Sequence, residues 1–255
     1  MSIFDLRDFK ESLETLANGG EVDDFYYLGD VSKVESMDIG QEGLKLIADI
    51  EAHDGIVDPS MFWKWDDLHG TNFTMKMTHL RDWYTTHYGF VIPTQKFIDG
   101  LSLWIGDKKV LSVLSGSGTV ERALQKTGTN IIMTDDMSWV KGLKYNSRGS
   151  AFSHWNVENI EDIDAVEAIE KYPDVDYILM SWPPYDTYIA SEVLAAMREF
   201  NPNATLIYFG EDDGGCCGDD DFFANAEYIS DNGIDELMRY YVRFPTIHDT
   251  VMLFK

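Results

Sequence analysis

The sequence is poor in cysteine and in long apolar runs, and both features narrow the class of protein. Its 255 residues include only two cysteines, the neighbours Cys216 and Cys217, which cannot build a disulfide framework and lack zinc-site spacing. No apolar run approaches the roughly 18 residues that a membrane span requires. The N-terminal residues show no secretory signal. A soluble, cytoplasmic, globular protein is therefore expected.

Basic residues are also scarce. Twenty Lys and Arg stand against 45 Asp and Glu, which gives a formal net charge of -25. The longest basic run is Lys108-Lys109, so the sequence shows no positive stripe that would neutralise phosphates. Nucleic acid is an unfavourable partner unless folding gathers a basic face. The acidic surface either keeps the protein soluble or imitates nucleic acid and occupies a basic protein partner.

The hydrophobic pattern changes near residue 92. Up to that point the periodicity is mostly helical, and from Pro93 onward short apolar runs alternate with helical stretches, as in a parallel sheet with crossover helices. The sequence predicts a helical N-terminal extension over 1–92 and an α/β domain over 93–255. Helices are expected at 3–18, 41–52, 59–68, 74–88, 97–105, 119–127, 138–147, 160–171 and 187–200. Strands are expected at 110–114, 130–134, 175–180 and 204–209, with two more, 237–243 and 247–254, closing the sheet edge.

A glycine turn follows the first strand. Residues 114–119 read Leu-Ser-Gly-Ser-Gly-Thr and lead into a predicted helix. Gly116 and Gly118 can adopt conformations closed to other residues, and the helix offers unpaired N–H groups to a polar or anionic ligand. The turn lacks both the Gly-Lys-Ser/Thr ending of a phosphate loop and the full dinucleotide fingerprint. The glycines alone favour a plain strand-to-helix turn, and the case for a ligand site depends on the motifs that follow.

Acidic residues end the second predicted strand. Asp135 and Asp136 lie at its carboxyl end, where nucleoside-binding α/β folds place an acid that accepts the ribose hydroxyls. Since acids are abundant in this chain, a chance match is the alternative.

A Pro-Pro turn ends the strand predicted at 175–180. The residues after it read Ser181, Trp182, Pro183, Pro184 and Tyr185. Two prolines cannot extend a central strand, so the chain must turn at the carboxyl edge, where α/β ligand sites lie. The turn would present carbonyl oxygens and an aromatic face, which suits a planar amino group. The alternative is a rigid loop with a packed tyrosine.

Taken in this order, the glycine turn, Asp135 and the Pro-Pro-Tyr turn resemble the S-adenosylmethionine-dependent methyltransferases of the Rossmann-like class I superfamily, and in particular the amino-methyltransferases. The resemblance covers about residues 93–255 and implies a mostly parallel seven-stranded sheet with helices on both faces. It implies that Gly116 and Gly118 line the methionine moiety, Asp135 contacts the ribose, and Asn156 or Val157 contacts the adenine edge. The candidate cofactor-binding residues are Ser112, Leu114, Ser115, Gly116, Gly118, Asp135, Asp136 and Asn156.

The sequence departs from the family pattern at three positions. Ser112 replaces the usual acid of the first strand, and Leu114 replaces a glycine. Trp182 stands where the family has the Asp or Asn that accepts a hydrogen bond from the target amine, whereas an indole N–H can only donate. The alternative acceptors are the Ser181 hydroxyl and the carbonyls of Trp182 and Pro183. The candidate catalytic residues are Ser181, Pro183, Pro184 and Tyr185, with Trp182 expected to contact the substrate.

An acidic, glycine-rich loop follows the strand predicted at 204–209. It carries six carboxylates between Glu211 and Asp221. They could chelate a hard cation, but the spacing of a calcium loop is absent, and no metal site is expected. We favour a loop whose aspartates cap the next helix, with Glu211 as a substrate-pocket residue.

Three functions remain open at this point. The leading hypothesis is S-adenosylmethionine-dependent methyl transfer to a protein or small molecule rather than to duplex DNA. The second is a catalytically inactive methyltransferase-fold protein that acts as an acidic interaction module or nucleic-acid mimic. A metal-dependent hydrolase built on residues 211–221 comes last.

Overall fold

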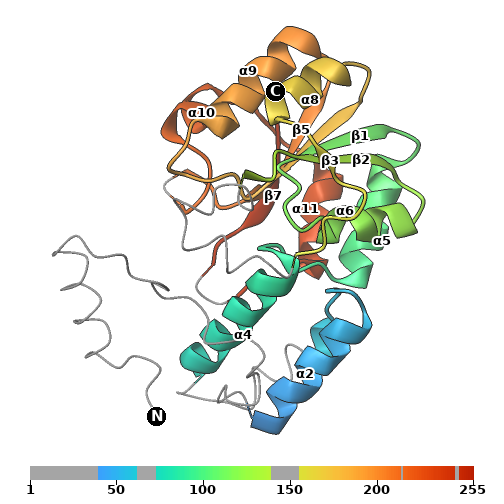
Figure 1. Cartoon of the computed structure of the whole chain (residues 1–255), viewed down its shortest axis with the longest axis vertical. Coiled ribbons are helices and arrows are strands. Elements are labelled where there is room, and N and C mark those ends of the chain that lie inside the picture. The colour runs from blue at the N-terminus through green and yellow to red at the C-terminus, as the bar shows by residue number, and fades with distance from the viewer. Residues whose placement is uncertain (1–39, 62–72, 139–154, 214, 245–246) are drawn as a thin grey trace, which may run out of the picture.

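The computed structural model describes residues 40–61, 73–138, 155–213, 215–244 and 247–255 (Figure 1). The helix predicted at 3–18 and most of the helices predicted at 59–68 and 138–147 lie outside these ranges. Within the ranges, no helix combines the length and apolar character that a membrane crossing requires.

A seven-stranded sheet forms the centre of the molecule (Figure 1). Its order is β3-β2-β1-β4-β5-β7-β6, and all neighbouring strands are parallel except at β7, which runs antiparallel to β5 and β6. The mostly parallel α/β sheet implied by the methyltransferase resemblance is confirmed. The strands are β1 Lys109–Val113, β2 Asn130–Asp135, β3 Glu161–Asp162, β4 Tyr177–Ser181, β5 Thr205–Gly210, β6 Tyr228–Ile229 and β7 Thr250–Phe254.

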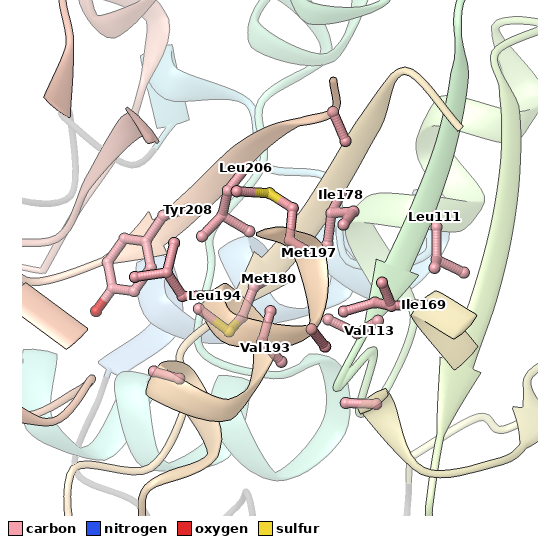
Figure 2. Close-up of a cluster of buried hydrophobic side chains, with 14 of the residues drawn as sticks. Leu111, Val113, Ile169, Ile178, Met180, Val193, Leu194, Met197, Leu206 and Tyr208 are labelled. Carbon is pink, nitrogen blue, oxygen red and sulfur yellow. The ribbon is translucent and has the colours of Figure 1, made fainter. Parts of the chain in front are cut away.

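Helices cover both faces of the sheet. On one face lie α8 (Ala165–Lys171), α9 (Ile189–Phe200) and α10 (Asp220–Asn225), and on the other lie α5 (Gln95–Ile105), α6 (Thr119–Lys126) and α11 (Asn232–Leu237) (Figure 1). Successive residues of a strand point to opposite faces, and both faces are covered, so the central strands read as continuous apolar runs. Figure 2 shows the first layer, where Met180 of β4 packs with Val193 and Met197 of α9.

The N-terminal helices form a third core. Helices α2 (Gly40–Ala52) and α4 (Phe73–Tyr88) confirm the helices predicted at 41–52 and 74–88. Their buried Ile50 and Trp83 pack with Val242 and Phe244, which come from the C-terminal part of the chain. The N-terminal helices therefore pack against the C-terminal part of the chain through a common hydrophobic cluster.

Residues 160–171, predicted as one helix, form a short strand and a shorter helix. Strand β3 occupies Glu161–Asp162, and α8 begins only after Asp164. The Asp164 side chain accepts the backbone N–H groups of Val166 at 2.8 Å and Glu167 at 3.4 Å, so it caps the helix at this point. The cap separates the two elements.

The prediction of two strands at the sheet edge is half wrong. Asp231 caps α11 by accepting the N–H groups of Gly233 and Ile234, and this helix runs to Leu237. A 3₁₀ turn, Met238–Tyr240, follows it, and Val242 forms only an isolated bridge with Ile92. The other predicted strand, 247–254, is β7 at Thr250–Phe254. It lies between β5 and β6 rather than at the edge.

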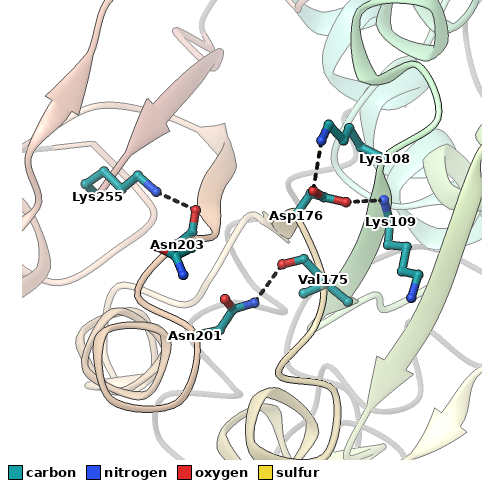
Figure 3. Close-up of polar contacts among 7 residues, drawn as sticks. All are labelled: Lys108, Lys109, Val175, Asp176, Asn201, Asn203 and Lys255. Carbon is teal, nitrogen blue, oxygen red and sulfur yellow. Dashed lines mark hydrogen bonds and ion pairs between the residues drawn. The ribbon is translucent and has the colours of Figure 1, made fainter.

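Polar contacts fasten the amino ends of the parallel strands (Figure 3). The Asp176 carboxylate accepts the Lys109 backbone N–H at 2.8 Å and pairs with the Lys108 ammonium group at 3.2 Å. The Asn201 amide donates to the Val175 carbonyl at 2.7 Å. These contacts join neighbouring strands at the edge opposite to the glycine and Pro-Pro turns.

Candidate functional site

The strand order changes direction between β1 and β4. The helix after β1, α6, packs on one face of the sheet, and the helix after β4, α9, packs on the other. The loops that leave these neighbouring strands therefore diverge, and open α/β sheets bind ligands where this happens. The glycine turn at 114–118 and the Pro-Pro turn at 182–185 are those two loops. The fold thus brings the two motifs together.

The glycine turn has an alternating left-handed backbone. The φ angles are +54° at Leu114, +53° at Gly116 and +65° at Gly118, which directly precedes α6. The Gly118 N–H donates to the Ser115 carbonyl at 2.8 Å and closes the turn. Glycine adopts this conformation without the cost that a side chain adds and that Leu114 bears, so the backbone favours glycine at positions 116 and 118.

The Asp135 carboxylate supports the turn from behind. It is 5% exposed, and its two oxygens accept the N–H groups of Gly116 and Met137, each at 2.8 Å. The half-buried Asp136 accepts the Ser138 N–H at 2.8 Å. Asp135 lies beside the glycine turn as predicted, and its contact with a ribose stays a prediction.

A second carboxyl group lies beneath the turn, and sequence reasoning missed it. Glu121 of α6 is 2% exposed and accepts the Ser112 hydroxyl at 2.7 Å, while Ser115 donates to Ser112 at 3.0 Å. Burial raises the pKa of Glu121, and the Ser112 hydrogen bond opposes that shift. Ser112 thus meets an acid that comes from the following helix. The only signal in the sequence is an acidic residue among the apolar positions of that helix.

Three aromatic rings connect the glycine turn to the Pro-Pro turn. A Cβ atom placed on Gly116 would lie 2.8 Å from Cζ3 of Trp155, so this indole lies directly against the turn. The Phe90 ring meets Trp155 edge-on with centroids 6.2 Å apart, and it stacks on Trp182 at 5.3 Å. Trp155 and Phe90 were not predicted as site residues.

The exposed residue Asn156 is linked to the glycine turn by hydrogen bonds of the Arg122 side chain. Its side-chain oxygen accepts the Glu158 N–H at 2.9 Å, and its carbonyl accepts the Arg122 guanidinium at 3.2 Å. The same guanidinium donates to the Ser117 carbonyl at 2.5 Å. The structure therefore places Asn156 beside the turn, with its side chain engaged in a local turn of its own.

The Pro-Pro turn is attached to the acidic loop. The Pro183 carbonyl accepts the Gly218 N–H at 2.9 Å, and the Pro184 carbonyl accepts the Thr187 hydroxyl at 3.2 Å. Of the acceptors proposed for a substrate amine, the Pro183 carbonyl is thus occupied by the protein itself. Ser181 is half-buried at the end of β4, and Tyr185 is 57% exposed.

The polar atom of Trp182 faces the interior. Trp182 has a left-handed backbone with φ of +48°, and its backbone N–H donates to the Phe209 carbonyl at 2.7 Å. Burial raises the pKa of Asp249, and the Tyr241 hydroxyl and the Trp182 indole oppose the shift. Tyr241 donates to this carboxylate at 2.7 Å. Within the described ranges, Trp182 Nε1 and Asp249 Oδ1 reach no hydrogen-bond geometry with any group.

The acidic loop is held by its own carboxylates. Glu211 is 6% exposed and accepts the N–H groups of His248 at 2.8 Å and Cys216 at 2.7 Å. Burial favours a higher pKa for Glu211, but these hydrogen bonds outweigh it and lower the pKa. Asp219 caps α10 by accepting the Phe222 N–H at 3.0 Å, which confirms the predicted capping role of this loop. In the described part of the chain, no three His, Cys, Asp or Glu residues gather as metal ligands.

Comparisons with known proteins add only remote likenesses. No family model matches the sequence, and no curated protein matches it. Similar solved structures include TehB of Haemophilus influenzae (TM-score 0.38, 15% identity, 69% of this chain and 66% of that chain) and a SAM-dependent methyltransferase of Archaeoglobus fulgidus (0.36, 12%, 64% and 95%). A SAM-dependent methyltransferase of Agrobacterium tumefaciens follows (0.34, 14%, 63% and 59%), so this chain spans about three fifths of that protein's length. At such values the chemistry must be argued from this chain's own residues.

Proposed function

We propose that this protein transfers a methyl group from S-adenosylmethionine to an acceptor bound where the chain leaves β1 and β4. One observation carries the proposal: the left-handed glycine turn and the Pro-Pro turn flank the point where the strand order changes direction. The cofactor supplies an activated methyl group. Transfer from a sulfonium needs little acid or base chemistry, so the protein mainly positions the reactants and excludes water.

The roles of the chain's own residues follow from their placement. Gly116 and Gly118 let the backbone approach a ligand closely, and Asp135 holds that backbone in place from behind. On the acceptor side, the half-buried Ser181 hydroxyl and the Trp182 carbonyl are the acceptors that we propose for the substrate. The exposed Tyr185 supplies the aromatic face.

With the side chains as they stand, a ring of the protein covers one side of the turn. The Trp155 indole lies against Gly116, the residue to which the resemblance assigns the methionine moiety. The Asp135 oxygens each accept a backbone N–H group, and because a carboxylate oxygen has more than one lone pair, these bonds do not exclude a ribose hydroxyl. A cavity of about 580 Å³ lies elsewhere, between the end of α2 and the start of α5, and none of the predicted site residues lines it. A cofactor that contacts the covered side of Gly116 therefore requires Trp155 to leave the turn.

The acceptor that we propose is a protein or small molecule rather than duplex DNA. Asp186 and the loop residues Asp212, Asp213, Asp220 and Asp221 are exposed on the segments next to the Pro-Pro turn, and the chain's net charge is -25. Phosphates would be repelled by such a surface, whereas neutral or cationic groups would not. The inward-facing Trp182 indole also offers no acceptor for an adenine amine.

Isothermal titration with S-adenosylmethionine and S-adenosylhomocysteine tests the proposal. We expect micromolar binding that Gly116→Val abolishes, because the added side chain fills the turn. Gly106→Val is the matched control, since Gly106 also has a positive φ (+64°) but has open space where its Cβ would lie. It introduces similar backbone strain away from the two turns and should leave binding intact.

The same titration decides between this function and an acidic interaction module. The observation that favours the module is the Trp155 cover on the glycine turn. If the folded wild-type protein and a variant without the Trp155 indole both fail to bind either nucleoside, methyl transfer is the wrong function. The search would then turn to basic protein partners.

A further inference from the structure

Trp155 covers the side of Gly116 toward which a side chain at this position would point. The indole comes so close to Gly116 that a single added carbon would lie 2.8 Å from Cζ3. No ligand atom can approach Gly116 from that side while the ring remains there. The turn keeps glycine at this position, and a side chain of the same protein fills the space that glycine leaves.

The N-terminal part of the chain anchors Trp155. Its indole N–H donates to the Thr85 carbonyl of α4 at 2.8 Å, and Phe90 packs edge-on against its ring. The Ser117 hydroxyl donates to the Tyr88 carbonyl at 2.5 Å, so the segment that anchors Trp155 also contacts the turn. Residues 85–90 therefore hold the indole and the turn together.

We propose that Trp155 competes with the cofactor for the glycine turn and so sets the affinity of this site. The inference rests on the proposed function and adds an intramolecular competitor to it. A ligand that binds only the open form has an apparent dissociation constant equal to the intrinsic constant divided by the open fraction. Removing the competitor raises the open fraction to one, so affinity must rise.

Titration of S-adenosylhomocysteine into wild-type protein, Trp155→Ala and Trp155→Phe tests the competition. We expect Trp155→Ala to bind about tenfold more tightly than wild type, as for a site that is open in about one molecule in ten. Trp155→Phe keeps a ring but loses the hydrogen bond to Thr85, and a smaller gain of about threefold is expected. It also carries the test if the alanine variant does not fold.

Trp104→Phe is the matched control for Trp155→Phe. Trp104 also donates its indole N–H within the protein, to Asp231 at 3.1 Å, and it packs on Tyr177 away from the glycine turn. Its replacement should leave the affinity at the wild-type value. If Trp104→Phe raised the affinity for S-adenosylhomocysteine as much as Trp155→Phe does, the cause would be a general loss of rigidity, and the proposal would be overturned.

Fluorine NMR provides a readout independent of affinity. The protein labelled with 5-fluorotryptophan has seven tryptophan positions, and Trp155→Phe assigns one signal. On adding S-adenosylhomocysteine, the Trp155 signal should move and the Trp104 signal should not. Binding with a stationary Trp155 signal, or equal or weaker affinity in Trp155→Ala, would refute the competition and leave the proposed function standing. No binding by either protein would remove both.

Discussion

The two glutamates buried at the carboxyl edge differ in how the protein treats their charge. Glu121 beneath the glycine turn is 2% exposed and Glu211 in the acidic loop is 6% exposed. Their pKa values move in opposite directions, up for Glu121 and down for Glu211.

The balance between burial and hydrogen bonds differs at the two sites. Glu211 accepts two backbone N–H groups, from Cys216 and His248, which together outweigh its burial. Glu121 accepts the Ser112 hydroxyl, and there burial outweighs the hydrogen bond. Backbone N–H groups stabilise only an acceptor, while a hydroxyl can rotate to serve either form of the acid. The acidic loop is therefore built around a fixed negative charge, and the glycine turn lies over a carboxyl that is more easily protonated.

Among these substitutions, Glu211→Ala should lower the free energy of unfolding the most. The substitution leaves two backbone N–H groups without their charged acceptor, so the free energy of unfolding should fall by about 3 kcal/mol. Chemical denaturation followed by circular dichroism measures the change. The exposed Asp212 in the same loop is the control, and Asp212→Ala should stay within about 0.5 kcal/mol of wild type. Equal effects of the two substitutions would show that Glu211 does not hold the loop.

Glu121→Gln should change how the stability of the protein depends on pH. Because the folded-state pKa of Glu121 is raised, its contribution to stability is present below the unfolded value of 4.5 and is lost as pH rises through the folded value. Glutamine can still accept the Ser112 hydroxyl and carries no charge. The variant should therefore gain on the order of 1 kcal/mol at pH 7 and lose that advantage toward pH 4.

Glu211→Gln should show the opposite sign. The folded-state pKa of Glu211 is lowered, so its contribution is present above 4.5 and is lost as pH falls through the folded value. Urea denaturation of the wild type and the two glutamine variants across pH 3 to 8 measures both trends. Parallel pH profiles in the two variants would contradict the opposed pKa shifts.

The sheet could be predicted from sequence because its signal is local. Strands β1 and β5 are buried on both faces and read as apolar runs, and the glycine and Pro-Pro turns directly follow β1 and β4. The prediction of a strand from residue 237 was wrong because an apolar run preceded by Asp231 also suits a capped helix. Asp231 caps α11, which includes residue 237.

The cover on the site could not be predicted because its contacts are long-range. Trp155 lies against Gly116 and is held by Thr85 of α4 and by Phe90 just after that helix, about 65 to 70 residues earlier in the sequence. Periodicity and motif spacing report on residues that are neighbours in the sequence. They do not report on contacts between residues that are far apart in the sequence. Asn156 was selected for its place in a family pattern, while the residue before it makes the contact.

Tyr185→Ala should have the smallest effect on stability and so separates the two sides of the proposed site. Tyr185 is 57% exposed, so the free energy of unfolding should change by less than about 0.5 kcal/mol. If its ring packs the acceptor, turnover should fall while the affinity for S-adenosylhomocysteine stays unchanged, because the glycine turn is untouched. Tyr188, which is 69% exposed, is the matched control, and Tyr188→Ala should leave both quantities at wild-type values. A loss of folding in Tyr185→Ala would instead make the tyrosine a structural part of the turn, and the acceptor would have to be sought at Ser181 alone.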